Sequence, residues 1–365
     1  MAWQKTVLLI LASAICGACG QNNPVSTSKD KLEAGIRDLM LDFTKEVDIP
    51  GMGLGYYSNT VGTVMVAVGK SDMEHDVPLT VNTHYPIQST SKMFISILTL
   101  QLIEENKLLL ESTIDEWTAD VPNSKQIAIR NLLNHTSGLN GYFENREFMD
   151  AYYSDTGRKY SRNDLIHAGL ELPYSAEDFG KFKYSNTNYL LLANIIESIT
   201  GQSIGQVLEQ RIFNPAGMDE TYYKPDLPAD TTSILTCYRD AEAVDLEKAN
   251  FASNAAGGII STLGDMFKFA HWIMENGYEN RMTSDLIFNF AAEDITFSAG
   301  LGIEVIDSLY GTELMGHSGG NPGLISEFYF SVETGEIFIF FINEGNPRVN
   351  YPLRGKLDSI LQSHR

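Results

Sequence analysis

Residues 89–110 read STSKMFISILTLQLIEENKLLL, a long apolar run that opens with Ser89 and Lys92. Apolar side chains fall on every side of its first turns, which is typical of a buried helix. Residues three apart lie on one helix face, so the Lys92 amine can reach the Ser89 hydroxyl. A lysine that acts as a base must have its pKa lowered from about 10.4 toward roughly 7–8, which burial favours. The stretch therefore predicts a central helix with an activated serine at its start.

The same Ser-x-x-Lys spacing also occurs from Ser26 to Lys29. That copy lies in the polar segment 21–28, which has no hydrophobic periodicity and is typical of a flexible tether. Nothing there would bury or orient the lysine. The surrounding sequence therefore favours Ser89.

Strand-like segments lie near both ends of the chain. Residues 52–57 and 62–68 predict a hairpin, and residues 301–306, 325–330 and 336–342 predict further strands. Strands near both ends of the chain, with a mostly helical region between them, indicate an antiparallel sheet that is closed by the two termini.

Helical patterns fill most of the remaining sequence. Asp30 is the expected cap of a first amphipathic helix, Gly201 ends a helix that starts at Tyr189, and a last amphipathic helix closes the chain. Residues 110–290 look mostly helical, with long polar loops. The predicted fold class is α+β, with the sheet flanked by helices and a mostly helical domain inserted. The predicted sheet domain comprises residues 30–88 and 292–365, and the helical domain residues 89–291, with the active site at their interface.

A second motif, Tyr184-Ser185-Asn186, stands directly before the Tyr189 helix. Tyr184 could relay a proton between Ser89 and a leaving group, while Asn186 hydrogen-bonds the substrate. The same Tyr-x-Asn spacing recurs at Tyr57, in the predicted hairpin turn, and at Tyr278, in a polar stretch. Tyr184 lies between Phe182 and an apolar helix, so it is the better-held candidate.

A third motif, His317-Ser318-Gly319, is followed by Gly320 and precedes a predicted strand. Glycines at a sheet edge let a substrate approach the backbone, whose N–H groups can then hold an oxyanion. The similar triplet at His167 is expected inside a helix.

In this order, the three motifs resemble those of the serine β-lactamase and penicillin-binding-protein-like hydrolases. The resembling branch contains class C β-lactamases, D-Ala-D-Ala carboxypeptidases and related esterases. The resemblance covers about residues 30 to 350 and includes residues 132–139 (LLNHTSGL) and 257–262 (GGIIST). It implies Ser89 as nucleophile and Lys92 with Tyr184 as the proton-handling pair. It also implies an oxyanion hole from the N–H groups of Ser89 and Gly320, and a structural rather than catalytic role for His135.

One position departs from the class C pattern, which has lysine where this chain has His317. Neutral histidine offers less fixed positive charge to a substrate carboxylate. Histidine here resembles the peptidase and esterase members, so we expect weak β-lactamase activity.

Two other interpretations compete with this one. Residues 316–320 (GHSGG) also match Gly-x-Ser-x-Gly, the nucleophile elbow of α/β-hydrolases, which would make Ser318 the nucleophile. That motif needs a helix directly after the serine and a later histidine, for which only His364 is available. The other alternative is a non-catalytic envelope-binding lipoprotein with the same fold.

The first nineteen residues predict an export signal, with Lys5 ahead of an apolar stretch from Val7 to Ile15. Cys19 resembles a bacterial lipid-attachment site, and the alternative is an ordinary cleaved signal peptide. We expect an exported protein, either periplasmic or anchored to the membrane through a lipid. Cys237 would be the one cysteine left in the mature chain, so no internal disulfide is expected.

Composition limits the partners. The net charge of −21 argues against nucleic acid, because the long-range field would repel it. The seven histidines show no His-x-His or His-Glu-x-x-His spacing, so neither a metal nor another cofactor is predicted. The predicted function is a serine hydrolase that forms an acyl-enzyme on Ser89 and cleaves an amide or ester. D-Ala-D-Ala-type peptides, short acyl esters and β-lactams all suit this chemistry.

Overall fold

The computed structural model describes residues 27–154, 160–226, 234–244, 254–286, 288–292, 295–309, 312–321, 323–345 and 350–362. The predicted export signal, Cys19, Ser26 and His364 lie outside the described residues. Within them, no helix combines the length and the apolar character needed to cross a membrane.

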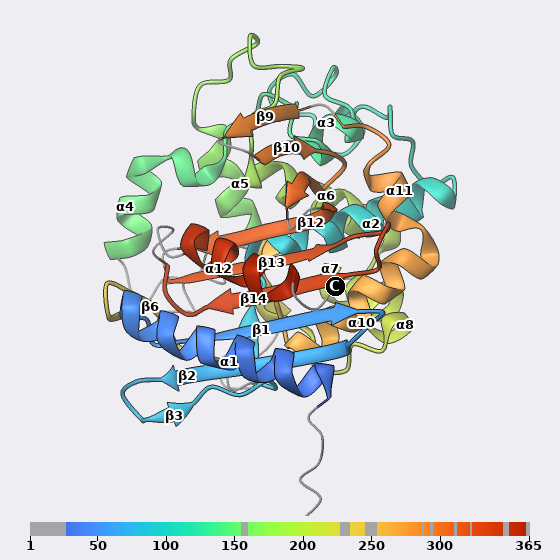
Figure 1. Cartoon of the computed structure of the whole chain (residues 1–365). Helices are drawn as coiled ribbons and strands as arrows, with labels where there is room; N and C mark the ends of the chain where they lie inside the picture. Colours follow the sequence, from blue (N-terminus) through green and yellow to red (C-terminus); the bar gives the residue numbers. More distant parts are fainter. Residues whose placement is uncertain are drawn as a thin grey trace, which may run out of the picture.

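An antiparallel sheet of nine strands forms the centre of the molecule, with the order β3-β2-β1-β14-β13-β12-β11-β10-β9. The third and fourth strands of this order join the two ends of the chain, since Met52 of β1 lies opposite Ile342 of β14 (Figure 1). This arrangement confirms the predicted fold class. The strands are β1 Gly51–Ser58, β2 Gly62–Asp72, β3 Val77–Pro78, β9 Phe288–Ala292, β10 Ile295–Ala299, β11 Glu304–Leu309, β12 Thr312–Asn321, β13 Leu324–Phe330 and β14 Ile337–Ile342.

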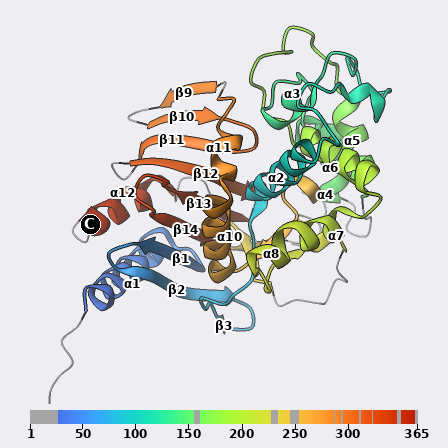
Figure 2. The same ribbon diagram turned by 90° about the vertical axis from the view of Figure 1, so that its right-hand side faces the viewer.

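Two terminal helices, α1 (Ser28–Val47) and α12 (Asn350–Gln362), cover one face of the sheet (Figure 2). The expected cap at Asp30 was wrong, because α1 starts earlier at the N-cap Thr27. Asp30 is instead the third residue of a capping box, in which its carboxylate accepts from the Thr27 N–H. The two helices bury one apolar face each against the sheet: Leu32, Ile36, Met40 and Phe43 in α1, and Leu353, Leu357 and Leu361 in α12.

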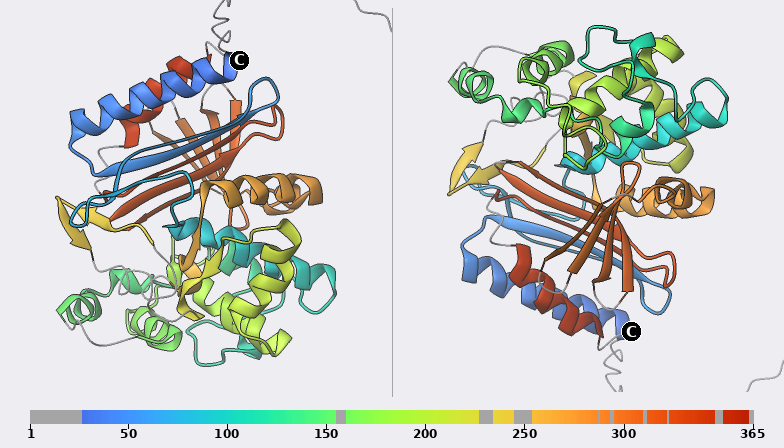
Figure 3. Two further views of the ribbon diagram at one scale, coloured as in Figure 1. Left: turned by 90° about the horizontal axis from the view of Figure 1, so that it is seen from below. Right: turned by 90° about the horizontal axis from the view of Figure 1, so that it is seen from above.

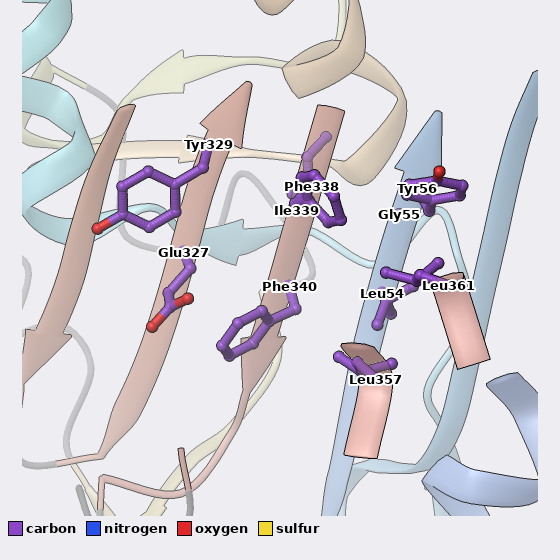
Figure 4. Close-up of a pocket in the computed structure, with 10 residues that line it drawn as sticks. All are labelled: Leu54, Gly55, Tyr56, Glu327, Tyr329, Phe338, Ile339, Phe340, Leu357 and Leu361. Carbon is purple, nitrogen blue, oxygen red and sulfur yellow. The ribbon is translucent and has the colours of Figure 1, made fainter. Parts of the chain in front are cut away.

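A small pocket lies between this sheet face and α12, and Figure 4 shows its lining. Leu357 and Leu361 come from α12, and the other lining residues belong to β1, β13 and β14. The lining is apolar except for Tyr56, Tyr329 and Glu327. The pocket belongs to the packing of the α12 layer, on the face away from Ser89.

The opposite face of the sheet carries α10 and, beyond it, the helical part of the chain (Figure 3). Phe267 of α10 packs on Gly55, and the Phe269 ring lies 5.6 Å from the Phe328 ring of β13. The sheet therefore includes β9, which starts at Phe288, and is covered by α10, which ends at Asn276. The helices of this side are α2 Ser91–Glu104, α3 Ile129–Leu133, α4 Arg146–Ser154, α5 Arg162–Leu170, α6 Asn186–Thr200, α7 Ile204–Leu208, α8 Asn214–Ala216, α10 Leu263–Asn276 and α11 Tyr278–Met282.

Short strands interrupt the region that was expected to be mostly helical. Together with β4, which lies before this region, they form a three-stranded sheet and a two-stranded ribbon. Strands of two or three residues are too short to leave an alternating pattern in a sequence. They are β4 Tyr85–Pro86, β5 Tyr222–Tyr223 and β8 Ile259–Ser261 in the sheet, and β6 Cys237–Arg239 and β7 Glu242–Val244 in the ribbon.

Helix α2 is buried, as predicted, but it ends at Glu104 and not at residue 110. Asn106 follows in the left-handed conformation, with a φ of 56°, and turns the chain away. Leu108 is buried again after that turn. The apolar residues beyond the turn therefore continued the pattern of the helix without belonging to it.

Replacing Ile36 with alanine should test how far α1 contributes to the core. Ile36 is fully buried, so Ile36→Ala should lower the free energy of unfolding by about 2–5 kcal/mol. The matched control is Arg37→Ala on the exposed side of α1, which should change stability by less than about 1 kcal/mol. Urea unfolding measures both, and equal effects would contradict this packing.

Candidate active site

Ser89 lies in the short 3₁₀ helix η1 (Gln88–Thr90), which leads directly into α2. The side chains of Thr90, Ser91 and Lys92 are buried, whereas Ser89 remains partly accessible. Backbone N–H groups at the start of a helix have no partner inside the helix. Ser89 is therefore exposed to a substrate at a helix end whose dipole favours negative charge.

Lys92 is completely buried behind Ser89. Its Nζ lies 3.0 Å from Ser89 Oγ and donates a hydrogen bond of 2.7 Å to the carbonyl of Ala256. The rings of Tyr184 and Tyr189 lie 5.0 and 5.6 Å from Nζ. Burial lowers the pKa of Lys92 well below the ordinary value, although the Glu304 carboxylate opposes that shift. The predicted activated lysine is thus present in a setting that favours the neutral amine.

Tyr184 donates a hydrogen bond of 2.9 Å to Ser89 Oγ from the segment just before α6. The residue is 37% exposed, yet desolvation of its phenol raises its pKa above the ordinary value. The hydrogen bond with Ser89 acts in the opposite direction. A raised pKa keeps the phenol protonated at neutral pH, so Tyr184 can donate a proton.

His135 supports Tyr184 from behind. Its ring stacks on the Tyr184 ring at 4.4 Å, and its Nδ1 accepts a hydrogen bond from the Ser185 N–H. Its carbonyl accepts another from the Lys183 N–H. Burial lowers the pKa of His135 well below its ordinary value, so the ring stays neutral. These contacts fit the structural role expected for His135.

Strand β12 brings the third motif against η1. The Thr90 hydroxyl donates to the His317 carbonyl at 3.2 Å, and Ser326 of β13 donates to the Ile87 carbonyl at 3.1 Å. Gly319 makes this contact close enough, because a Cβ there would lie 2.7 Å from Ile87 O. The structure therefore brings Ser89, Lys92, Tyr184 and the His317 motif together.

The edge of β12 offers a backbone donor beside Ser89. Ladder bonds alternate along an antiparallel strand, so every second N–H points to the same side. The Ser318 N–H points toward β11, where it donates to Glu304 at 2.8 Å. The Gly320 N–H points the same way. It lies beyond the end of the pairing between β11 and β12, because the first residue of β11, Glu304, is opposite Gly316. Gly320 is thus suited to the predicted oxyanion hole with Ser89.

The other candidate positions are also placed. Asn186 is the first residue of α6, half-buried and two residues after Tyr184. The other two Tyr-x-Asn tyrosines lie elsewhere. The Tyr57 hydroxyl donates a hydrogen bond to Asn59 in the β1–β2 hairpin, and the Tyr278 hydroxyl, in α11, accepts one from Gln101. His167 lies inside α5, as expected.

The nucleophile-elbow interpretation of Ser318 was wrong. Ser318 stands within strand β12, and the next element is strand β13 instead of the required helix. Its hydroxyl donates to Glu304 at 3.2 Å. The geometry that exposes a serine at a sharp strand-to-helix turn is absent at this position.

A turn around Asn254 holds the Ala256 carbonyl, and the sequence motifs did not identify it. Asn254 Oδ1 accepts from Arg162 Nε, the Tyr223 hydroxyl and the Ala255 N–H, at 2.8 to 2.9 Å. Arg162 is itself fixed by Glu197. This turn stands directly before the GGIIST segment, and that segment was the only sequence feature that pointed to the turn.

Glu304 of β11 is a second group that the motifs missed. It accepts from the Ser318 backbone and from the Tyr329 hydroxyl, and it lies 3.5 Å from His317 Nδ1. Its only sequence signal was a carboxylate among the apolar residues of the predicted strand 301–306. Among the described residues, no group of three or more His, Cys, Asp and Glu side chains is arranged to hold a metal.

Gly319→Ala should weaken catalysis without unfolding the protein. The added Cβ would meet Ile87 O at 2.7 Å and Gln88 Cβ at 2.8 Å, which pushes η1 away from β12. A displacement near 1 Å can slow a reaction about 100-fold, so we expect a loss of about 10- to 100-fold in kcat/KM. Gly264→Ala is the control, because its Cβ would have only an ordinary contact at 3.8 Å. Unchanged activity in Gly319→Ala would contradict the close contact.

The family model described as Beta-lactamase matches residues 36–359. The chain is 26% identical over 315 residues to the "Putative penicillin-binding protein PbpX" of Bacillus subtilis (strain 168), covering 84% of this chain and 73% of that protein. It is 27% identical over 269 residues to the D-aminopeptidase of Brucella anthropi, covering 70% of this chain and 49% of that protein. The chain thus spans only about half the length of that second relative.

Among solved structures, the D-amino acid amidase from Ochrobactrum anthropi SV3 complexed with D-phenylalanine superimposes with a TM-score of 0.80 at 24% identity. The match covers 92% of this chain and 100% of the amidase chain, which establishes a shared fold. Because the family model spans nearly the whole described fold and all three motifs, the chain belongs to the Beta-lactamase family.

Proposed function

We propose that this protein is a serine hydrolase that forms an acyl-enzyme on Ser89 and cleaves an amide or ester. The observation that carries the proposal is the position of Ser89 Oγ, 3.0 Å from buried Lys92 Nζ and 2.9 Å from the Tyr184 hydroxyl oxygen. A serine hydroxyl needs an adjacent base to become a nucleophile, and both neighbours can exchange its proton.

In this proposal Lys92 is the immediate base. A neutral amine has two N–H groups and one lone pair, and one N–H is engaged by the Ala256 carbonyl. The lone pair can then accept the Ser89 proton. The ammonium that forms is stabilised by the Ala256 carbonyl, by the two tyrosine rings and by the charge of Glu304.

Tyr184 then supplies the proton to the leaving group. Its raised pKa favours the protonated phenol, which already donates to Ser89 Oγ. The N–H groups of Ser89 and Gly320 would hold the oxyanion, and His317 would contact the substrate beside it. A water molecule finally releases the acyl group from Ser89.

The relatives suggest the kind of substrate. The similar proteins include a penicillin-binding protein, a D-aminopeptidase and a D-amino acid amidase, and the last two act on D-amino acid derivatives according to their names. We propose a short D-aminoacyl amide, D-Ala-D-Ala-type peptide or ester for this chain as well, with β-lactams as poor substrates. The expected export signal would place this activity in the cell envelope.

A purely binding role is the other candidate. A binding site would gain nothing from a lysine buried without a carboxylate in contact, because burial of an ammonium is unfavourable. Lys92 has its acceptor in the Ala256 carbonyl and faces Ser89 instead. This placement favours catalysis.

Ser89→Ala should abolish acylation. We expect a loss of about six orders of magnitude in turnover of a p-nitrophenyl ester, because the nucleophile is removed. A fluorophosphonate probe followed by intact-mass analysis should label the wild type once and this variant not at all. Ser359→Ala, on the exposed side of α12, is the control and should be labelled normally. Labelling of Ser89→Ala would refute the proposal.

The acylation rate should depend on pH through Lys92. Because catalysis uses the neutral amine, the rate should rise with pH through the lowered pKa of Lys92 and level off well below 10.5. Lys92→Arg should remove this profile together with the activity, since a guanidinium stays charged. Single-turnover acylation measured between pH 5 and pH 10 would test this, and a rate that rises only near pH 10 would contradict it.

A further inference from the structure

Glu304 closes the ladder between β11 and β12 next to the catalytic serine. Strand β11 begins at Glu304, opposite Gly316, so the residues of β12 beyond that level have no strand partner on this side. The Glu304 carboxylate takes the place of the missing strand. It accepts from the Ser318 N–H at 2.8 Å and from the Ser318 hydroxyl at 3.2 Å.

Tyr329 holds the same carboxylate from the other side of β12. Its hydroxyl donates to Glu304 at 2.6 Å, and Figure 4 shows this hydroxyl pointing away from β14 toward the neighbouring strand. Its ring crosses Gly316, where a Cβ would lie 2.8 Å from Tyr329 Cδ1. Glu304 is only 8% exposed. The Ser318 N–H, the Ser318 hydroxyl and the Tyr329 hydroxyl all donate to its carboxylate and keep it in one position.

The Ser318 carbonyl, with Glu304 beside it, determines which nitrogen of the His317 ring carries the proton. His317 Nδ1 lies 2.5 Å from the Ser318 carbonyl and 3.5 Å from Glu304 Oε1. Carbonyl and carboxylate oxygens only accept hydrogen bonds here, so Nδ1 must carry a proton. Burial lowers the pKa of His317, with Glu304 opposing and Lys92 reinforcing that shift. The neutral ring therefore keeps a lone pair on Nε2.

His317 faces the helical side of the site. Alternate residues of β12 point to opposite faces of the sheet, so His317 and Gly319 point to the same face. A Cβ at Gly319 would meet Ile87 and Gln88, which lie on the helical side. The titratable groups that act on His317 are Glu304 from β11, Lys92 from α2 and His135 from the segment after α3. The pKa values of Lys92, His135 and His317 are all lowered, so the negative charge of Glu304 is not matched by a nearby cation among these groups.

We propose, on the basis of the function proposed above, that Glu304 is a positioning residue that sets the substrate class. It holds His317 as a hydrogen-bond acceptor and disfavours a substrate carboxylate at this side of the site. The preferred substrates present an uncharged hydrogen-bond donor there, such as a primary amide. Among the substrates proposed above, the amides and esters are therefore preferred, and a D-Ala-D-Ala-type peptide with a free terminal carboxylate is the poorest.

The chemical step is ordinary acyl transfer. Ser89 Oγ forms a bond to the carbonyl carbon, and the C–N bond of the amide breaks. The amine leaves with the proton that Lys92 took from Ser89 and that Tyr184 passes on. Water then hydrolyses the ester on Ser89 and restores the hydroxyl, so no oxidant or cofactor is needed.

A matched pair of substrates tests the inference. D-Ala-D-Ala and D-Ala-D-Ala-amide differ only in the charge of the terminal group. The wild type should show a kcat/KM at least about tenfold higher for the amide, because like charges in a poorly solvated site repel strongly. Glu304→Gln should bring this ratio close to one, whereas Glu304→Asp, which keeps the charge, should retain most of it.

Glu327→Gln is the matched control. Glu327 is also a buried carboxylate, on β13, but it pairs with Arg354 of α12 on the far face of the sheet. This variant can lose stability, yet its ratio of the two substrates should stay that of the wild type. A wild-type ratio of one or less, or an equal change in both variants, would overturn the role of Glu304.

A second measurement needs no change at Glu304. Nitrogen chemical shifts of the wild type at pH 7 should show His317 with a proton on Nδ1 and none on Nε2, assigned by its disappearance in His317→Asn. A ring protonated on Nε2, or on both nitrogens, would overturn the inference. Ester turnover at Ser89 serves as the baseline, since its absence would refute the proposed function itself and not merely the substrate preference.

Discussion

The burial of Lys92 is the constraint on which the rest of the site depends. No carboxylate lies within ion-pair distance of its amine among the described residues, and its hydrogen-bond partners are an uncharged carbonyl and the Ser89 hydroxyl. An ammonium in that position would lose its hydration without gaining a direct counter-charge. The amine is therefore driven toward its neutral form, which is the form that can remove a proton from Ser89.

This arrangement requires three distant segments to meet at the start of α2. The segment before α6 supplies Tyr184, the turn at Asn254 supplies the Ala256 carbonyl, and β12 supplies the His317 motif. Each segment is held by contacts of its own: the stacking of His135, the three donors on Asn254, and the absence of a side chain at Gly319. The site is thus a property of the whole fold, because each segment would be misplaced without its support.

Much of this site was predictable from residue types and their spacing. Ser89 and Lys92 are three residues apart at the start of a buried helix, and Tyr184 precedes a second one, so local context was enough to single them out. The antiparallel sheet followed from strand patterns at both ends of the chain. The structural role of His135 was expected only from the resemblance of residues 132–139 to a recurring segment of the family.

The missing parts depended on contacts between segments far apart in the sequence. The Ala256 carbonyl is a backbone group and has no side-chain signature. The partners of Glu304 lie 14 and 25 residues away, at Ser318 and Tyr329, so no local pattern connects them. The end of α2 was also missed, because Leu108 is buried after the turn as it would be in a longer helix.

The protonation state of Lys92 tests the account most directly. Carbon labelling of lysine would allow the Lys92 Cε resonance to be titrated by NMR, with Lys92→Met to assign it. The account predicts a neutral amine that becomes charged only at a pH well below the ordinary lysine pKa of 10.5. A Lys92 that stays charged up to about pH 10, like a lysine in water, would contradict it.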